Sequence, residues 1–356
     1  MITFGFEQVA PHPCTAVLPF SYDEFIVHKE EAYLLAKTEN EGVIHYTPSQ
    51  WEEHKHLYDL LDDPRTSSPD WHVIFITMND AFYTAFHDLI PIVLKIHKAY
   101  PYTYFIIHNT MAYGMGSKLT MNSRSATTEY IRSFLDHEGV TYFFHEKGDS
   151  PVAFKVTNLI RLGEQETRVA FTFTSGDIKN GMEAVKNHVL TEEERQVAPY
   201  RKVYLSRRHL DHDRTLPGVE AVGGGENRVS TDIRMDNEET LENYFRGKGY
   251  EIVTPEEKFK TIEDQVKFFN QTKILVGLTG TGLANGHFMQ KDQIVVDIGS
   301  ELAFEDEKWG VLQVFESNHY LTDSYMQETV HILIPSRRNA AEVIERIEKV
   351  SETLSL

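Results

Sequence analysis

The chain of 356 residues contains a single cysteine, Cys14. One cysteine excludes an intramolecular disulfide, and it also excludes any cysteine-based zinc or iron–sulfur site built within one chain. The sequence lacks an apolar run of about 18 residues, which a membrane-spanning helix requires. Residues 1–20 lack the basic start and the apolar stretch of a secretory leader. These absences favour a soluble, cytoplasmic protein with no transmembrane segment.

Positive charge is scarce, because 35 Lys and Arg stand against 54 Asp and Glu and the net charge is −19. Such a field repels nucleic acids and anionic membranes, so neither is an expected partner. An anionic ligand would need a local cluster of basic side chains. The proportion of apolar residues, 41%, is otherwise typical of a folded globular chain.

The length is roughly twice the usual domain size of about 150 residues, which predicts two domains. The first 50 residues indicate a β-rich segment, and strands alternate with helices from residue 71 onward. We expect a domain of residues 1–195 and a second of residues 196–356, each an α/β domain with a doubly wound parallel sheet. The patterns predict strands over 71–78, 102–108, 140–145, 202–206, 250–254, 273–278 and 293–298, and helices over 81–100, 126–137, 178–200, 237–247, 262–270, 281–289 and 339–351.

One segment has the pattern of a phosphate site. The strand 273–278 runs into Thr279, Gly280, Thr281 and Gly282, and a helix follows directly. The start of that helix presents free backbone N–H groups and a positive dipole end. Glycine lets backbone approach a diphosphate closely, and the two threonine hydroxyls can add donors. The alternative is a tight turn that binds no ligand.

Arg207 and Arg208 provide the basic pair that such a site needs. They follow the strand 202–206, so they are expected at the carboxyl edge of the same sheet, where open α/β sheets bind ligands. Guanidinium groups match phosphate oxygens in a bidentate way. A surface pair with no ligand is the alternative.

Four motifs in this half resemble glycosyltransferase family 61 in their order and spacing, over about residues 201–300. They are Ser206-Arg207-Arg208, then Arg234-Met235-Asp236-Asn237-Glu238, then Asp264-Gln265-Val266, then Gly280-Thr281-Gly282-Leu283-Ala284-Asn285 with His287-Phe288-Met289. The family includes plant xylosyltransferases and arabinosyltransferases and the EGF-domain-specific O-linked N-acetylglucosamine transferase. The chain departs from the family at Thr279, where a histidine is usual, and at Asp297, where a glutamate is common.

The resemblance implies a GT-B fold, in which two Rossmann-like domains face a cleft. It also implies a UDP-sugar donor in the second domain, a hydroxyl acceptor on a glycan or glycoconjugate, and anomeric inversion with no obligatory metal or other cofactor. The last helix, 339–351, has one apolar stripe and could cross back to brace the first domain.

The resemblance assigns roles to particular residues of the second domain. Donor or diphosphate binding falls to Arg207, Arg208, Thr279, Gly280, Thr281, Gly282 and Asn285. Arg234, Asn237 and Glu238 match a supporting R-x-x-N-E element, and Glu238 alternatively caps a helix or braces an arginine. Asp297 could accept hydrogen bonds from ribose hydroxyls or could merely cap a turn. Gln265 is expected to form local contacts only.

The general base is expected in the first domain. His87 and Asp88 resemble the family's helix that bears a histidine and an aspartate, although Thr84 stands where that histidine is common. Either side chain could deprotonate an acceptor hydroxyl, or the pair could be an ordinary surface pair. His108, at the end of the next strand, is a third candidate or a core residue.

Three other functions fit parts of the sequence. Asp211-His212-Asp213 is a D-x-D element of the kind that holds manganese on a nucleotide diphosphate, which would make the transferase metal-dependent. Gly280 and Gly282 with Asp297 could indicate a nicotinamide dehydrogenase, although Asn285 replaces its third glycine. A catalytically inactive protein that binds a nucleotide or a sugar is the third. The sequence leaves the oligomeric state open.

Overall fold

The computed structural model describes residues 26–36, 44–78, 84–109, 118–146, 149–161, 175–208, 235, 237–300, 328–336 and 339–354. These residues form two compact units: the first unit contains the described residues of 20–114 and 127–181, and the second contains those of 115–126 and 182–356. Each unit contains a sheet with parallel strands, so the predicted α/β class is confirmed. The arrangement of two Rossmann-like domains about a cleft stays a prediction.

The first unit is built on a mixed sheet with the strand order β2-β1-β7-β4-β5-β6, and β3 pairs with β7. Its strands are β1 (Ile26–Ala36), β2 (Ile44–Tyr46), β3 (Asp59–Leu61), β4 (His72–Met78), β5 (Thr103–Asn109), β6 (Thr141–His145) and β7 (Val152–Arg161). β1 is antiparallel to β2 and β7, whereas β4, β5 and β6 are parallel neighbours. The strands β1 and β2, which are the described part of the predicted β-rich start, therefore share one sheet with the later βαβ pattern, and residues 1–25 lie outside the described residues.

The helical segments up to Val189 are α1 (Pro48–His54), η2 (Lys55–Leu57), η3 (Thr84–Leu89), α2 (Ile90–Ala99), α3 (Lys118–His137) and α4 (Ser175–Val189). Both α3 and α4 have residues in each of the two units. The helix expected over 81–100 begins as the π-helical turn η3. Pro91 explains the irregular turn, because it has no N–H to donate to the preceding turn of a regular helix. The helix expected from residue 126 begins earlier, at Lys118.

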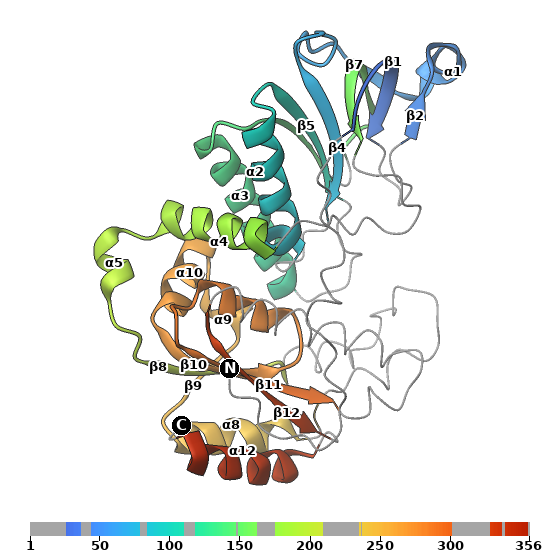
Figure 1. Cartoon of the computed structure of the whole chain (residues 1–356). Helices are drawn as coiled ribbons and strands as arrows, with labels where there is room; N and C mark the ends of the chain where they lie inside the picture. The colour runs from blue at the N-terminus through green and yellow to red at the C-terminus, as the bar shows by residue number, and fades with distance from the viewer. Residues whose placement is uncertain are drawn as a thin grey trace. The chain divides into compact units, whose positions relative to one another are not determined.

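The second unit has a sheet of parallel strands in the order β12-β11-β10-β8-β9. These are β8 (Arg201–Leu205), β9 (Glu251–Val253), β10 (Thr272–Leu278), β11 (Ile294–Ser300) and β12 (Val330–Ser336). The helices are α5 (Glu192–Gln196), α8 (Glu238–Gly247), α9 (Pro255–Lys258), α10 (Ile262–Asn270), the 3₁₀ helix η4 (Thr281–Phe288) and α12 (Ala340–Leu354). Figure 1 shows α8 and α12 on one face of this sheet and α9 and α10 on the other, as a doubly wound sheet requires.

The helix predicted over 178–200 is in fact two helices, α4 and α5. The chain leaves α4 after Val189, and Thr191 caps α5 by accepting a hydrogen bond from the N–H of Glu194. The Glu194 side chain in turn accepts the N–H of Thr191, which completes a capping box and fixes a new helix start.

The last helix, α12, belongs to the core of the second unit. Val343 and Ile347 are buried in one cluster with apolar residues of α8 and of the strands β8, β10, β11 and β12. The expectation that this helix braces the first domain is not confirmed.

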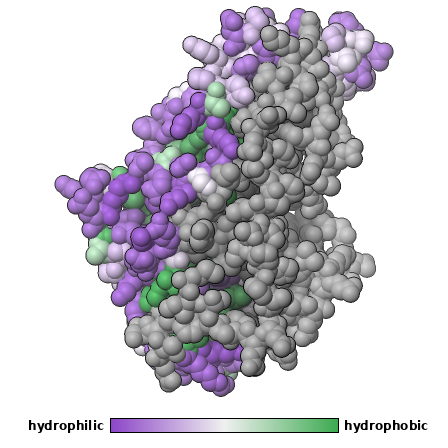
Figure 2. All heavy atoms as spheres, in the orientation of Figure 1, coloured by the Kyte–Doolittle hydropathy of each residue, from purple (hydrophilic) through white to green (hydrophobic). Residues whose placement is uncertain are grey.

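Hydrophilic residues dominate the described part of the face in Figure 2. The large apolar side chains are instead concentrated in clusters on the two sheets. No helix within the described ranges is long and apolar enough to span a bilayer.

Candidate functional site

The candidate site lies at the carboxyl edge of the second sheet. β8 and β10 are parallel neighbours, and Leu205 is paired with Gly277 near their ends. The two segments that follow these strands therefore emerge side by side. Nη1 of Arg207 lies 3.4 Å from the carbonyl oxygen of Thr279 and donates to it. The structure thus brings together one of the two predicted arginines and the glycine turn.

The glycine turn leads directly into η4. Gly280 has φ 157° and ψ 173°, a region that is open essentially only to glycine. The N–H of Leu283 donates to the carbonyl of Gly280 and starts the helix. In a 3₁₀ helix the first N–H groups have no partner inside the helix, so Thr281 and Gly282 present their amides at the turn. Of Thr281 the structure describes the backbone alone.

Thr279 connects the turn to the neighbouring strand β11 through its hydroxyl and its backbone N–H. Its side chain is buried, and Oγ1 donates to Oδ1 of Asp297 at 2.5 Å. Its N–H donates to the carbonyl of Ile298 at 3.1 Å. The hydroxyl of Thr279 is therefore hydrogen-bonded to β11 in this structure, and its predicted role as a phosphate donor stays a prediction.

Asp297 lies inside β11 and is fully buried. The expected strand ended at residue 298, but β11 continues to Ser300, so Asp297 does not stand at the sheet edge. Its other oxygen, Oδ2, is 3.6 Å from Nε2 of His331 on β12. A fully buried carboxylate that accepts from Thr279 supports the turn, and the contact of Asp297 with a ribose stays a prediction.

Asn285 connects the glycine turn to α10. Its Nδ2 donates to the carbonyl of Gly282 at 2.8 Å, and its Oδ1 accepts from Nε2 of Gln265 at 2.6 Å. Both side chains are buried. Asn285 therefore acts on the shape of the turn, where the sequence indicated a direct ligand contact, and Gln265 reaches farther along the chain than expected.

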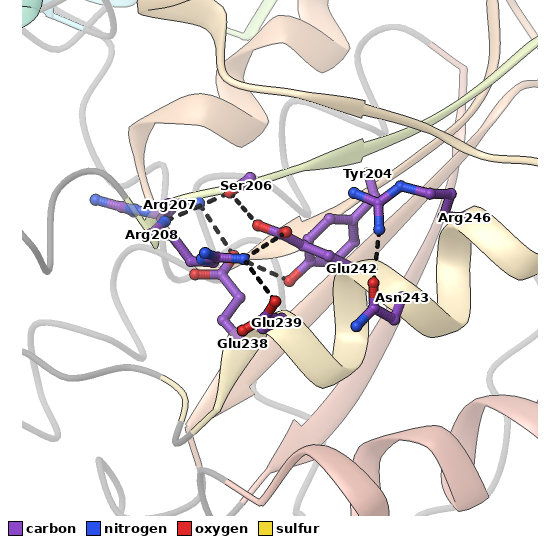
Figure 3. A network of polar contacts seen from close by, with 9 residues as sticks. All are labelled: Tyr204, Ser206, Arg207, Arg208, Glu238, Glu239, Glu242, Asn243 and Arg246. Carbon is purple, nitrogen blue, oxygen red and sulfur yellow. Dashed lines mark hydrogen bonds and ion pairs between the residues drawn. The ribbon is translucent and has the colours of Figure 1, made fainter.

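Glu238 braces the arginine segment, which was the structural alternative for this residue. It is the first residue of α8 and is 4% exposed. Its Oε1 accepts the backbone N–H of Arg207 and the hydroxyl of Tyr204, both at 3.0 Å (Figure 3). Burial, together with Glu238 and Glu242 of α8, raises the pKa of Tyr204 well above its usual value, so this phenol stays a donor. Asn237, with φ 58°, turns the chain into α8.

Glu242, one turn further along α8, has no role in the sequence interpretation. Its Oε1 accepts from the hydroxyl of Ser206 at 2.7 Å, and its Oε2 accepts from Nη1 of Arg208 at 3.0 Å. Glu239 lies 3.8 Å from the same nitrogen. The spacing of four residues from Glu238 places both glutamates on one helix face and could have revealed this position.

The candidate bases lie in the first unit. His87 and Asp88 are in η3, where the structure describes the backbone of these two residues and not their side chains. His108 is buried at the end of β5, and its Nδ1 is 2.9 Å from Nδ1 of His145. Burial and the neighbouring imidazole lower the pKa of His108 to about 4. A group with that pKa is a weak proton acceptor at neutral pH.

Nε2 of His145 is 3.1 Å from the carbonyl oxygen of Ser150, which can only accept. We therefore assign the proton of neutral His145 to Nε2, and its Nδ1 accepts from Nδ1–H of His108. His108 thus fits the core alternative. Three other predicted residues, Arg234, Asp211 and Asp213, lie outside the described residues.

A parallel α/β sheet with a glycine turn and a guanidinium at its carboxyl edge is typical of proteins that bind nucleotides. The family model Glycosyltransferase 61 matches residues 82–296, more than half of the chain. The chain therefore belongs to glycosyltransferase family 61 and is a glycosyltransferase by family, as its motifs indicated. The matched range includes η3 of the first unit and the glycine turn of the second. No curated protein matches the chain.

Proposed function

We propose that this chain transfers a sugar from a UDP-sugar to a hydroxyl of a glycan or glycoconjugate, with inversion at the anomeric carbon and without an obligatory metal. The contact between Arg207 and the glycine turn carries the proposal. It gathers a guanidinium and helix N–H groups at one sheet edge of a molecule whose net charge is −19. An anion is favoured at this edge while the rest of the protein repels it.

The same groups serve the chemical step. As the bond to the sugar breaks, negative charge grows on the leaving diphosphate. The amides of Thr281 and Gly282 and the guanidinium of Arg207 stabilise that charge, and they need no reorganisation because the turn is already held by Thr279 and Asn285.

The acceptor hydroxyl attacks from the face opposite the diphosphate and loses its proton to a base. We assign this base to Asp88 or His87, within an acceptor-binding domain of residues 1–195, and the donor to a domain of residues 196–356. The low pKa of His108 makes it the weakest of the three candidates.

A thermal-shift screen tests the donor class. The protein is heated with UDP, with UDP-xylose, UDP-arabinose and UDP-N-acetylglucosamine, and with NAD, each with and without manganese. We expect UDP and at least one UDP-sugar to raise the unfolding temperature without metal. Stabilisation by NAD alone would exclude the proposal, and a requirement for manganese would favour a metal-dependent transferase.

Turnover is measured next, because binding does not distinguish an enzyme from an inactive binder. The UDP-sugar that stabilises the protein most is incubated with it, and released UDP is quantified with and without candidate saccharide acceptors. We expect release of UDP, and the anomeric configuration of the product determined by NMR tests inversion. Retention of configuration would contradict the mechanism while leaving the donor class intact.

A further inference from the structure

Two buried glutamates on successive turns of α8 contact the segment that carries Arg207. Glu238 and Glu242 are 4% and 6% exposed. Buried carboxylates are unfavourable unless hydrogen bonds or charges compensate them. Figure 3 shows both side chains directed toward the end of β8. The compensation comes from that segment, since Glu238 accepts from Tyr204 and Arg207, and Glu242 accepts from Ser206 and Arg208.

We infer that Glu242 is a positioning residue for the donor site, acting through Ser206 and Arg208 to fix the direction in which Arg207 projects. On this inference Arg208 is the buried glutamate's partner and does not bind the diphosphate. The inference rests on the proposed function, because it concerns the same diphosphate site.

The argument begins with the alternation of side chains along β8. Tyr204 stacks on Phe245 of α8, and Leu205 lies on the opposite face, near Gly277 and Gly282. Past the last strand residue the alternation continues: the hydroxyl of Ser206 returns to α8, and Arg207 reaches the turn at Thr279.

Strand pairing no longer imposes this alternation beyond Leu205, where β8 ends. One anchor past that point is the N–H of Ser206, which donates to the carbonyl of Val253. Two further anchors are the carboxylates of Glu238 and Glu242 on α8. Of these two, Glu242 binds the side chains of Ser206 and Arg208, the residues on either side of Arg207. Without Glu242, the side chain of Arg207 is expected to lose its fixed orientation.

The surroundings of Arg208 favour the partner role. Its Nη1 lies 3.0 Å from Oε2 of Glu242 and 3.8 Å from Oε1 of Glu239. The closer and buried carboxylate, that of Glu242, reduces the attraction of this guanidinium for a further anion. Arg207 differs, because its Nη1 contacts a carbonyl oxygen of the turn itself.

The test is a pair of double-mutant cycles read by calorimetric affinity for UDP and for inorganic pyrophosphate. We expect Glu242→Gln, which keeps an acceptor for Ser206 but loses the charge facing Arg208, to weaken binding about 3-fold, and Glu242→Ala about 10-fold. Arg208→Ala should add little to Glu242→Ala, because the two residues act as one unit. Arg207→Ala should lose most of its effect in the Glu242→Ala background.

Glu239→Gln is the matched control, because Glu239 is an exposed carboxylate of the same helix, α8, and lies near the same guanidinium, that of Arg208. The affinity of this variant for UDP and pyrophosphate should equal that of the wild type. Unfolding in urea, without ligand, identifies any variant that does not fold at the assay temperature. Independent effects of Arg208→Ala and Glu242→Ala, or an undiminished effect of Arg207→Ala, would overturn the inference.

The two ligands separate this inference from the proposed function. Binding of pyrophosphate but not of UDP by the wild type would overturn the donor class, and the cycles would still be measured with pyrophosphate. Binding of UDP with additive effects would overturn the positioning role alone. Binding of neither ligand would overturn both.

Discussion

Arg207 carries the largest part of the proposed phosphate recognition. Its guanidinium lies at the carbonyl of Thr279, next to the amides that begin η4. We expect Arg207→Ala to weaken UDP binding by about 1.5 to 3 kcal/mol, the usual worth of a hydrogen bond to a charged group. Isothermal titration measures this, with Arg246→Ala as the control. Arg246 is exposed, and among the described residues its side chain donates a hydrogen bond to Asn243 of the same helix. Equal affinities for all three proteins would place the diphosphate elsewhere.

His108 makes stability depend on pH. Its pKa is about 4 in the folded chain and about 6.5 when the chain is unfolded, so the unfolded state takes up a proton first as the pH falls. The free energy of unfolding should therefore decrease between pH 6.5 and 4, by about 2 kcal/mol from this residue, and be unaffected by it above pH 6.5. Urea unfolding at pH 7.5 and at pH 4.5 measures the decrease.

His108→Gln removes this titration. The variant should lose less stability than the wild type over the same pH interval. Equal losses in both proteins would mean that His108 titrates near its ordinary pKa in the fold.

At the scale of elements, the glycine turn keeps its shape because α10 supports it. Asn285 joins Gln265 to the carbonyl of Gly282 in a buried position. Asn285→Ala should lower the free energy of unfolding by about 2 kcal/mol, since it leaves a buried donor and a buried acceptor without this partner. It should also weaken UDP binding, because the amides of the turn would no longer be fixed. Asn285→Asp should be less harmful to the contact with Gln265, which needs only an acceptor.

Denaturant unfolding and UDP titration of the two variants check both effects. If Asn285→Ala binds UDP as tightly as the wild type, the turn does not depend on this support.

The strands and helices of the second unit were predictable because local residues mark where each element begins and ends. The strand 273–278 is apolar and ends in glycines, and Thr261 accepts the N–H of Asp264 at the start of α10. The proximity of Arg207 to the glycine turn was also predictable, because neighbouring parallel strands end at the same edge of a sheet.

Side-chain direction was not predictable. Whether Thr279 faces a ligand or Asp297 depends on β11, about twenty residues away, and no local pattern encodes that. Likewise, Asn285 is buried against α10 and Arg208 is paired with Glu242 through contacts between elements. The motifs therefore predicted which segments lie together at the sheet edge, and they did not predict the side-chain hydrogen bonds of Thr279, Asn285 and Arg208.

At the scale of the whole molecule, the proposed donor site belongs to one of the two units. Every group proposed to touch the diphosphate lies in the second unit, in the segments that follow β8 and β10 or at the start of η4. A ligand that binds only folded protein at 100 times its Kd stabilises that fold by about 2.7 kcal/mol. Amide exchange in β8, β10 and η4 should therefore slow in saturating UDP, whereas exchange in β1 and β7, which form the antiparallel part of the first sheet, should not change.

Hydrogen–deuterium exchange read by mass spectrometry measures this, with AMP at the same concentration as the control ligand. The result is specific, because a nicotinamide-type site would respond to AMP as well, and a site built on the first sheet would protect β4 and β5 first. Slower exchange at β10 and η4 that is lost in Arg207→Ala would locate the donor at the carboxyl edge of the second sheet, next to the guanidinium of Arg207.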